Sequence, residues 1–376
     1  MSLWVLYGMP GSLYTAKVRS YLRKQGLAYE ERIPGDPRFA ADILPAIGRW
    51  IIPVMQTPDG QIIQDGAEII DHLEQCGAAT RSAFPSDPVA RVVSHIFELF
   101  GGEGMLRPAM HYRWDFDADN LAFLQRDFVA GLNPSADAAT REQVFAFASG
   151  RMRGASKSFG VNPQSFATIE AAYLDLLARL DAHFELYPYL LGDAPTIGDY
   201  GLIAPLHAHL SRDPHPSHLM KTRALNVWRW VERMTTHDDF AGEYMARPEP
   251  ATTALESPSL ASLLSFVAED FLAEITAQVD HVRAWLPSQS EAALSGQPIE
   301  RGIGRTALNW RGHDLEIGVV PYRLWMLQRV GDAAAALSPV DAKRLAALLE
   351  PAGLASLLTL DAGRRVARRQ NREWWA

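Results

Sequence analysis

The chain has 376 residues, of which 48% are hydrophobic and 21% are charged, and its formal net charge is −8. This length favours two or three compact domains. No apolar stretch approaches the roughly 18 residues that a membrane span requires. The acidic charge balance argues against broad nucleic-acid binding, which needs a basic surface. We therefore expect a globular protein that binds neither nucleic acid nor a membrane.

The N-terminal segment and the cysteine usage favour a cytoplasmic location. Residues 1–7 lack the basic start and the small-residue cleavage site of a secretory signal. Cys76 is the only cysteine, which excludes an internal disulfide and a thiolate zinc site. We expect Cys76 to be a small apolar filler and not a nucleophile.

Strands and helices alternate in the N-terminal quarter. Residues 3–7 are apolar and aromatic and end at a Gly-Met-Pro-Gly loop. A helical pattern then runs from Ser12 to a stop at Gly26, and an extended segment follows at 29–33. These patterns predict a strand, a loop, a helix and a second strand.

The same region closes with a hairpin and a helix. A helix-like stretch at 39–47 precedes two extended segments that flank Pro58-Asp59-Gly60, a favourable turn sequence. Asp65-Gly66 then opens a helix with one apolar face. The order βαβαββα predicts a small α/β layer.

Beyond this layer the pattern is almost entirely helical. Apolar residues recur at helical spacing from about Asp87 to Met245, which predicts an all-α domain. A break follows at Arg247-Pro248-Glu249-Pro250, and Ser257-Pro258 starts a third, α-rich unit. Residues 307–318 of that unit form a possible β-hairpin.

Five arginines precede two tryptophans at the C-terminus. A solvated amphipathic helix or a tail docked on carboxylates explains this pattern better than a nucleic-acid or membrane arm. The arginines are Arg364, Arg365, Arg368, Arg369 and Arg372.

Three segments of the N-terminal quarter carry a family resemblance. They read YGMPGSLYTAKVR at 7–19, IIPV at 51–54 and QDGAEII at 64–70. Together, at these distances, they resemble the glutathione S-transferases. The resemblance implies a thioredoxin-like α/β domain over 1–80, an all-helical glutathione-transferase C-terminal domain over 86–245, and an α-rich extension over 255–376.

The resemblance also implies a glutathione site. Ser12 stands where the family places a residue that contacts the glutathione sulfur, and Tyr7 and Tyr14 are alternatives because some branches use a tyrosine. Ile52 would offer its backbone to the cysteinyl part of glutathione, beside a cis proline at Pro53. From the residues alone, Ser12 is equally explained as a helix cap.

The third segment departs from the family pattern. In the family a serine hydroxyl and a helix N-terminus hold the γ-glutamyl carboxylate, and here Gly66 replaces that serine. Asp65 could pair with the γ-glutamyl ammonium. Arg49 or Lys17 could supply charge for the glycyl carboxylate. We expect backbone donors and Asp65 to hold glutathione without the serine.

The second substrate is expected between the two domains, lined by the first long helix. Ordinary core packing explains these helical positions equally well. The candidates are Tyr14, Met105, Met110, His111, Tyr112 and Trp114.

Two further patterns are interpreted as structural. Thr196 and Asp199 resemble the family's internal capping box, a folding device. Four histidines lie close together in the sequence, but His-x-His on a helix points the rings to different faces, so we expect no metal. They are His207, His209, His215 and His218.

The sequence thus predicts a glutathione S-transferase-like enzyme that activates the glutathione thiol for attack on an apolar electrophile. Glutathione would be its co-substrate, without a metal, and the family resemblance implies a homodimer. A non-catalytic binding or scaffold protein is the alternative, motivated by Gly66. A glutathione lyase is disfavoured because that chemistry commonly uses a cysteine where Ser12 stands.

Overall fold

The computed structural model describes residues 3–237 and 253–376, and the chain divides into two compact units. Unit 1 comprises Met1–Ala83, Ala109–Ala155 and Tyr200–Glu249. Unit 2 comprises Phe84–Pro108, Ser156–Asp199 and Pro250–Ala376. Each unit therefore collects segments that are far apart in the sequence.

The family resemblance implied three domains, over residues 1–80, 86–245 and 255–376. This division stays a prediction. Their boundary at Met245 and the predicted break at Arg247–Pro250 lie outside the described residues.

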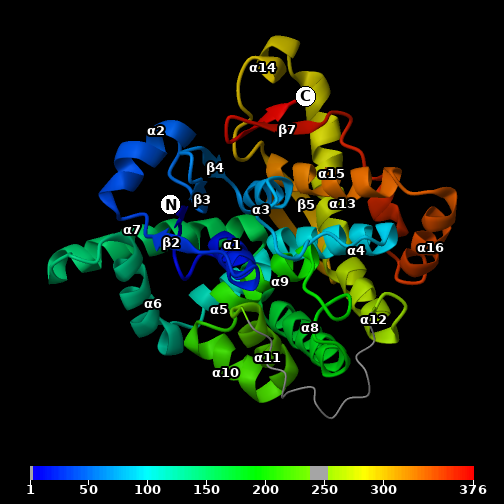
Figure 1. Ribbon diagram of the computed structural model, residues 1–376, viewed down its shortest axis with the longest axis horizontal. Coiled ribbons are helices and arrows are strands. Elements are labelled where there is room, and N and C mark those ends of the chain that lie inside the picture. Colours follow the sequence, from blue (N-terminus) through cyan, green and yellow to red (C-terminus); the bar gives the residue numbers. More distant parts are fainter. Residues whose placement is uncertain (1–2, 238–252) are drawn as a thin grey trace. The chain divides into compact units, whose positions relative to one another are not determined.

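The predicted βαβαββα order of the N-terminal quarter is confirmed in unit 1 (Figure 1). A π-helical turn, η1, continues directly into α2. The elements are β1 (Trp4–Tyr7), α1 (Leu13–Lys24), β2 (Tyr29–Arg32), η1 (Phe39–Ile43), α2 (Leu44–Ile47), β3 (Val54–Gln56), β4 (Ile62–Gln64) and α3 (Gly66–Gln75).

The four strands form one sheet in the order β2-β1-β3-β4. β1 pairs with β2 in parallel and with β3 antiparallel, and β3 pairs antiparallel with β4. Alternation along β1 sends Val5 and Tyr7 to one face, where they pack with Phe39 and Ile43. Leu6 is buried on the other face, and α3 contacts β3 and β4. The sheet is thus covered on both faces.

The remaining described helices of unit 1 follow the predicted all-α pattern. Three of them, α5, α7 and α9, cross a boundary between the two sets of segments. These helices are α5 (Leu106–Trp114), α6 (Asp117–Leu132), α7 (Ala138–Ser156), α9 (Ile197–Ala208), α10 (Pro214–Arg223) and α11 (Leu225–Met234).

Unit 2 combines two helical regions of the predicted all-α domain with the C-terminal extension. α4 runs beside α15 and α16, and α8 packs against α12 (Figure 1). The main elements are α4 (Pro88–Leu99), η2 (Phe100–Gly104), α8 (Phe166–Leu186), α12 (Pro258–Val267), η5 (Ala268–Leu272), α13 (Ala273–Trp285), α14 (Glu291–Ser295), α15 (Pro321–Ala335) and α16 (Pro339–Leu349). Among the residues that the structure describes, unit 2 also has three short 3-10 turns: η3 (Lys157–Phe159), η6 (Leu286–Ser288) and η7 (Ala355–Thr359).

Two hairpins belong to the extension. β5 (Arg305–Trp310) and β6 (His313–Gly318) form an antiparallel pair at the position of the possible hairpin in the sequence. β7 (Val366–Arg369) and β8 (Arg372–Trp375) form the second pair. Of the two interpretations of the arginine-rich tail, the amphipathic helix is wrong, because Gln370 and Asn371 both take positive φ and close a tight turn. The carboxylate docking is present, as Arg364 bonds Glu291.

Asp199 is fully buried and holds the start of α9, as the capping-box pattern predicts. Its Oδ2 accepts from the backbone N–H of Thr196 at 2.9 Å and from the Thr196 hydroxyl at 3.0 Å. Its Oδ1 accepts from the N–H of Leu190 at 2.9 Å. The carboxylate thus satisfies buried donors that would otherwise lose their hydrogen bonds.

Among residues 3–237 and 253–376, no helix combines the length and the apolar character that a membrane span requires.

A buried network of charges joins the extension to the rest of unit 2. Arg107 Nη2 donates to Glu274 at 2.5 Å, and Arg323 Nε donates to Glu103 at 3.1 Å. Arg323 also bonds Glu274. All four side chains are at most 4% exposed. Because two charges come from residues 103–107 and two from the extension, the extension is an integral part of this core.

We expect Arg323→Met to lower the free energy of unfolding by about 3 to 5 kcal/mol, because it leaves Glu103 buried without a counter-charge. Urea denaturation measures this change. Arg365→Met is the matched control, since Arg365 pairs with Asp332 at the surface and its loss should cost within about 1 kcal/mol. Equal effects of the two substitutions would contradict a stabilising role for the network.

Candidate functional site

Ser12 is the N-cap of α1, and its side chain remains partly accessible. Its Oγ accepts from the backbone N–H of Thr15 at 3.3 Å. A hydroxyl that accepts at its oxygen keeps its own O–H to donate. The first turn of α1 contains no acidic residue, so the positive end of the helix dipole is not offset there. Ser12 can therefore cap the helix and still donate to an anion.

The loop before Ser12 is packed so closely that it needs its glycines. A Cβ at Gly8 would lie 2.1 Å from Cγ2 of Thr15, and one at Gly11 would lie 2.9 Å from Oδ2 of Asp127. Real Cβ atoms do not approach other atoms so closely, so larger residues would displace the loop. The Gly-Met-Pro-Gly sequence thus fixes the path of the chain into Ser12.

The buried guanidinium of Arg113 contacts this loop through a hydrogen bond. Arg113, on α5, is 2% exposed, and its Nη1 donates to the carbonyl of Gly11 at 2.8 Å. Its Nη2 donates to the carbonyl of Ala208 at 2.7 Å. Nε and Nη2 also donate to the two carboxylate oxygens of Asp213 at 2.7 and 2.8 Å. The guanidinium therefore ties the peptide next to Ser12 to the ends of two other helices.

The pair of Arg113 and Asp213 is almost fully buried. Asp213 is the N-cap of α10 and has no exposed surface. Burial raises the pKa of the Asp213 carboxyl above its ordinary value, and the facing Arg113 guanidinium opposes that rise. A bidentate arginine contact of this kind is both strong and directional. Sequence reasoning missed both residues, because neither belongs to a local motif.

The predicted backbone contact lies at the start of β3. The Ile52–Pro53 peptide is cis, and the carbonyl of Pro53 accepts from the N–H of Asp65 at 3.4 Å. Arg49 Nη2 donates to Oε1 of Gln64 at 2.9 Å. The pairing of β3 with β4 therefore brings the segments around Pro53 and Asp65 together, and their role in binding glutathione stays a prediction.

Asp65 stands at the helix start that the sequence predicted. It is the N-cap of α3, with φ 107°, and is 6% exposed. Its Oδ1 accepts from the N–H groups of Ala67 at 2.8 Å and Glu68 at 3.3 Å. A positive φ is unfavourable for any residue with a Cβ, and the two charge-assisted bonds offset that cost. The carboxylate thus occupies the anion-binding end of the helix.

The family model of the glutathione S-transferase N-terminal domain matches residues 6–79. The N-terminal segment 6–79 is therefore similar to the N-terminal domain of the glutathione S-transferases. The matched range contains Ser12, Pro53 and Asp65, so the three resembling segments lie inside it.

Several solved structures are similar to this chain. Glutathione transferase GSTFuA3 from Phanerochaete chrysosporium is 17% identical, with a TM-score of 0.45 over 63% of this chain and 98% of that one. The beta-etherase LigF from Sphingobium sp. strain SYK-6 is 18% identical, with a TM-score of 0.44 over 66% and 96%. The glutathione S-transferase CsGST63524 of Ceriporiopsis subvermispora, in complex with glutathione, is 18% identical, with a TM-score of 0.41 over 66% and 99%. Among curated proteins, no sequence matches.

The predicted second-substrate residues are mostly packed in the interior. His111 Nδ1 lies 2.9 Å from Oδ2 of Asp115. Tyr112 stacks on Phe116, and Trp114 packs edge to face against Phe128. Tyr14, on α1, is partly accessible. Met105 and Met110 are also buried. A role in binding a second substrate stays a prediction for all of them.

The four histidines lie in different environments. His209 Nδ1 lies 2.9 Å from the carbonyl of Ala109, and burial lowers its pKa well below the ordinary value. His215 Nδ1 lies 2.8 Å from Asp119. His218 is exposed, whereas His207 is largely buried. In the described part of the chain, no group of three or more His, Cys, Asp or Glu side chains is arranged to hold a metal ion.

Cys76 corrects one expectation. It is exposed at the C-cap of α3, so the interpretation as a small apolar filler is wrong. The helix ends at Gln75, so Cys76 lies outside the packed helix face on which Ile69, Ile70 and Leu73 are buried.

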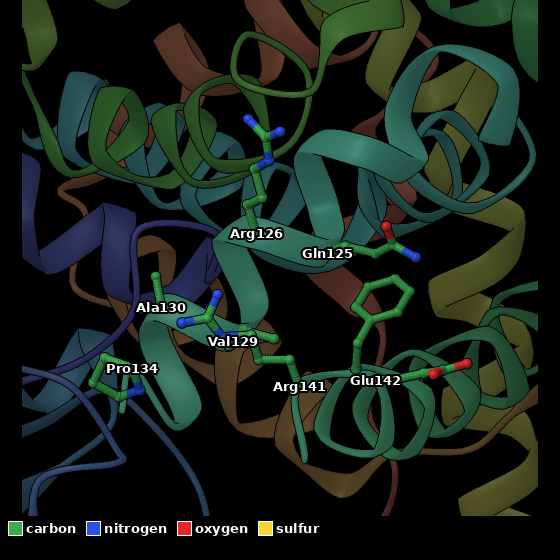
Figure 2. A pocket seen from close by; sticks show the side chains of 8 residues that line it. Gln125, Arg126, Val129, Ala130, Pro134, Arg141 and Glu142 are labelled. Atoms are coloured by element: carbon green, nitrogen blue, oxygen red, sulfur yellow. The ribbon is translucent and has the colours of Figure 1, made fainter. Parts of the chain in front are cut away.

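A hollow between α6 and α7 contains none of the predicted site residues. Figure 2 shows Arg141 reaching toward Val129 and Ala130, while Arg126 points away from them. The hollow is lined by Gln125, Arg126, Val129, Ala130, Pro134, Arg141, Glu142 and Phe145.

We expect Arg113→Lys to loosen the loop that positions Ser12, because an ammonium with three donors cannot replace a fork that makes four hydrogen bonds. Hydrogen–deuterium exchange should become faster at the amides of residues 12–16. Arg153→Lys is the matched control, since Arg153 is partly exposed and bonds the carbonyl of Trp114. Unchanged exchange in Arg113→Lys would show that the loop is held by other contacts.

His207 predicts a dependence of stability on pH. Burial, and then the nearby charges of Arg19 and Arg212, lower its pKa to about 3. An unfolded histidine titrates near ~6.5, so below that pH the unfolded state binds a proton that the folded state refuses. This difference should lower the free energy of unfolding by about 2 kcal/mol between pH 7 and pH 5.

Urea denaturation at these two pH values should therefore show a smaller fall for His207→Gln than for the wild type. His218→Gln, at an exposed position, controls for the substitution itself. Equal falls in His207→Gln and the wild type would contradict this role of His207.

Proposed function

We propose that this protein binds a glutathione-type thiol and lowers the pKa of its sulfur through Ser12, so that the thiolate attacks an apolar electrophile. The observation that supports this most is the position of Ser12 at the N-terminus of α1, with its O–H available and its loop clamped by Arg113. The match of residues 6–79 to a glutathione S-transferase domain supports the same ligand.

The chemistry requires a thiolate at neutral pH. A free thiol titrates near ~8.5, so only a few percent is ionised at pH 7. A hydroxyl donor and the helix dipole both stabilise the sulfur anion. A pKa lowered by two units corresponds to about 2.7 kcal/mol and raises the thiolate fraction at pH 7 roughly 25-fold.

The reaction would proceed in two steps. The thiol first loses its proton to solvent, and the resulting thiolate accepts a hydrogen bond from Ser12. The sulfur then donates an electron pair to an electrophilic carbon and forms a carbon–sulfur bond. Either a leaving group departs with its bonding pair, or the adduct takes a proton from water.

A second candidate function is a non-catalytic binding or scaffold protein. It is favoured by Gly66, which offers no hydroxyl to a ligand, and by the carboxylate of Asp65 at the start of α3. A homodimer and a cytoplasmic location, which the resemblance and the composition led us to expect, are further parts of the proposal.

Thiol titration separates the two functions. With glutathione bound, the ultraviolet absorbance of the thiolate should titrate at a pKa at least one unit higher in Ser12→Ala than in the wild type. Ser12→Thr keeps a hydroxyl and should retain the low value.

Loss of the cap alone should cost Ser12→Ala about 1 kcal/mol of stability, which is a separate readout. If Ser12→Ala loses that stability while the thiol pKa does not move, Ser12 is only a helix cap. If the wild type binds glutathione without lowering the thiol pKa, the non-catalytic function is supported.

A further inference from the structure

Ser259 and His183 form a hydrogen-bonded pair within unit 2. Ser259 lies in the first turn of α12, near the start of the extension, and His183 lies near the end of α8. Ser259 Oγ and His183 Nδ1 are 2.9 Å apart. The histidine is fully buried, whereas the serine is partly accessible. A hydroxyl within hydrogen-bond distance of a histidine is the arrangement that activates serine nucleophiles.

The other ring nitrogen of His183 decides the direction of this hydrogen bond. Nε2 lies 2.9 Å from the carbonyl oxygen of Leu190, which can only accept, so Nε2 carries the ring proton. Nδ1 is therefore unprotonated and accepts from the Ser259 hydroxyl. Burial lowers the pKa of His183 to about 4, so the ring is neutral at pH 7. The lone pair of Nδ1 is thus directed at the hydroxyl proton.

Contacts on both sides of the pair hold its two segments together. The N–H of Ala254 donates to the carbonyl of Leu191 at 3.0 Å, which fixes the chain just before α12. Within α12, the carbonyl of Ser262 accepts from Arg179 Nη1 of α8 at 2.9 Å. The two helices also pack against each other. The serine and the histidine are therefore positioned by the folded structure.

The start of α12 favours negative charge on the Ser259 oxygen. Ser257 is the N-cap, and its Oγ lies 3.2 Å from that of Ser259, so its O–H can donate to the Ser259 oxygen. The first turn of the helix has no acidic residue to offset its dipole. Among residues 3–237 and 253–376, the N–H of Ser259 has no hydrogen-bond acceptor. The N–H of the nucleophile's own residue is a known oxyanion donor in serine proteases.

We propose that Ser259 and His183 form a second reactive site, in which Ser259 is acylated by activated esters and phosphonylated by fluorophosphonates. His183 Nδ1 takes the hydroxyl proton as Oγ bonds to the carbonyl carbon, and the N–H of Ser259 donates to the oxyanion. The carbonyl then re-forms, and the alcohol departs with its bonding pair and takes the proton from Nδ1. This chemistry uses no residue of the site around Ser12 and does not depend on a thiol.

A fluorophosphonate with a fluorescent reporter tests this site in the full chain. Ser259 Oγ would form a bond to phosphorus, and fluoride would leave with its bonding pair. Peptide mass spectrometry should find the label on Ser259 in the folded protein. Wild-type protein unfolded in urea should not be labelled there, because the serine and the histidine then separate. This comparison needs no variant, so it decides the question even when a substitution prevents folding.

Two substitutions locate the source of the reactivity. His183→Gln keeps a donor for the Leu190 carbonyl but cannot take a proton, so it should slow labelling by about 10²- to 10⁴-fold. Circular dichroism checks that this variant folds. Ser265→Ala is the matched control, because Ser265 is also a partly exposed serine of α12 but bonds the carbonyl of Ala261 instead of a histidine. It should be labelled at the wild-type rate.

Three results would overturn the inference. Absence of label on Ser259 in the folded protein at millimolar probe would show that the pair is only a structural hydrogen bond. Equal labelling rates in the wild type and in folded His183→Gln would show that the histidine does not activate the serine. Equal labelling of Ser259 in folded and unfolded protein would show that the fold contributes nothing to its reactivity.

Discussion

The hydrogen bonds of the buried Arg113 guanidinium are the constraint on which the candidate site depends. They join the carbonyl of Gly11, the end of α9 and the start of α10, where Asp213 supplies the counter-charge. The close packing at Gly8 and the hydrogen bond from its N–H to the carbonyl of Arg32 at 2.9 Å hold the start of the same loop. The chemistry proposed for Ser12 thus depends on a residue about a hundred positions away in the sequence.

The N-termini of α1 and α3 differ in their charged groups. At the sulfur end, Ser12 stands on a helix N-terminus without acidic neighbours, an environment that favours an anion. At the start of α3, the carboxylate of Asp65 accepts from the N–H groups of Ala67 and Glu68. The Ile52–Pro53 backbone lies in the same domain and bonds the start of α3 through Pro53.

Local patterns predicted most of the N-terminal domain. The turn at Pro58-Asp59-Gly60, the cap at Ser12 and the start of a helix after Asp65 each depend on a few neighbouring residues, so a single sequence suffices. What could not be predicted depends on distant partners. The clamp by Arg113 and the pairing of Arg323 with Glu103 join residues more than one hundred positions apart, and isolated arginines give no signal of burial. The β7–β8 hairpin of the tail was not predicted, because its turn residues Gln370 and Asn371 include no glycine to mark positive φ.

The most direct test of the proposed function is a crystal structure of the protein soaked with glutathione sulfonate, an unreactive analogue of the thiolate. The proposal predicts density with the sulfonate within hydrogen-bond distance of Ser12 Oγ and the cysteinyl backbone beside Ile52. Ligand bound elsewhere, or density at this site with the sulfonate turned away from Ser12, would contradict it.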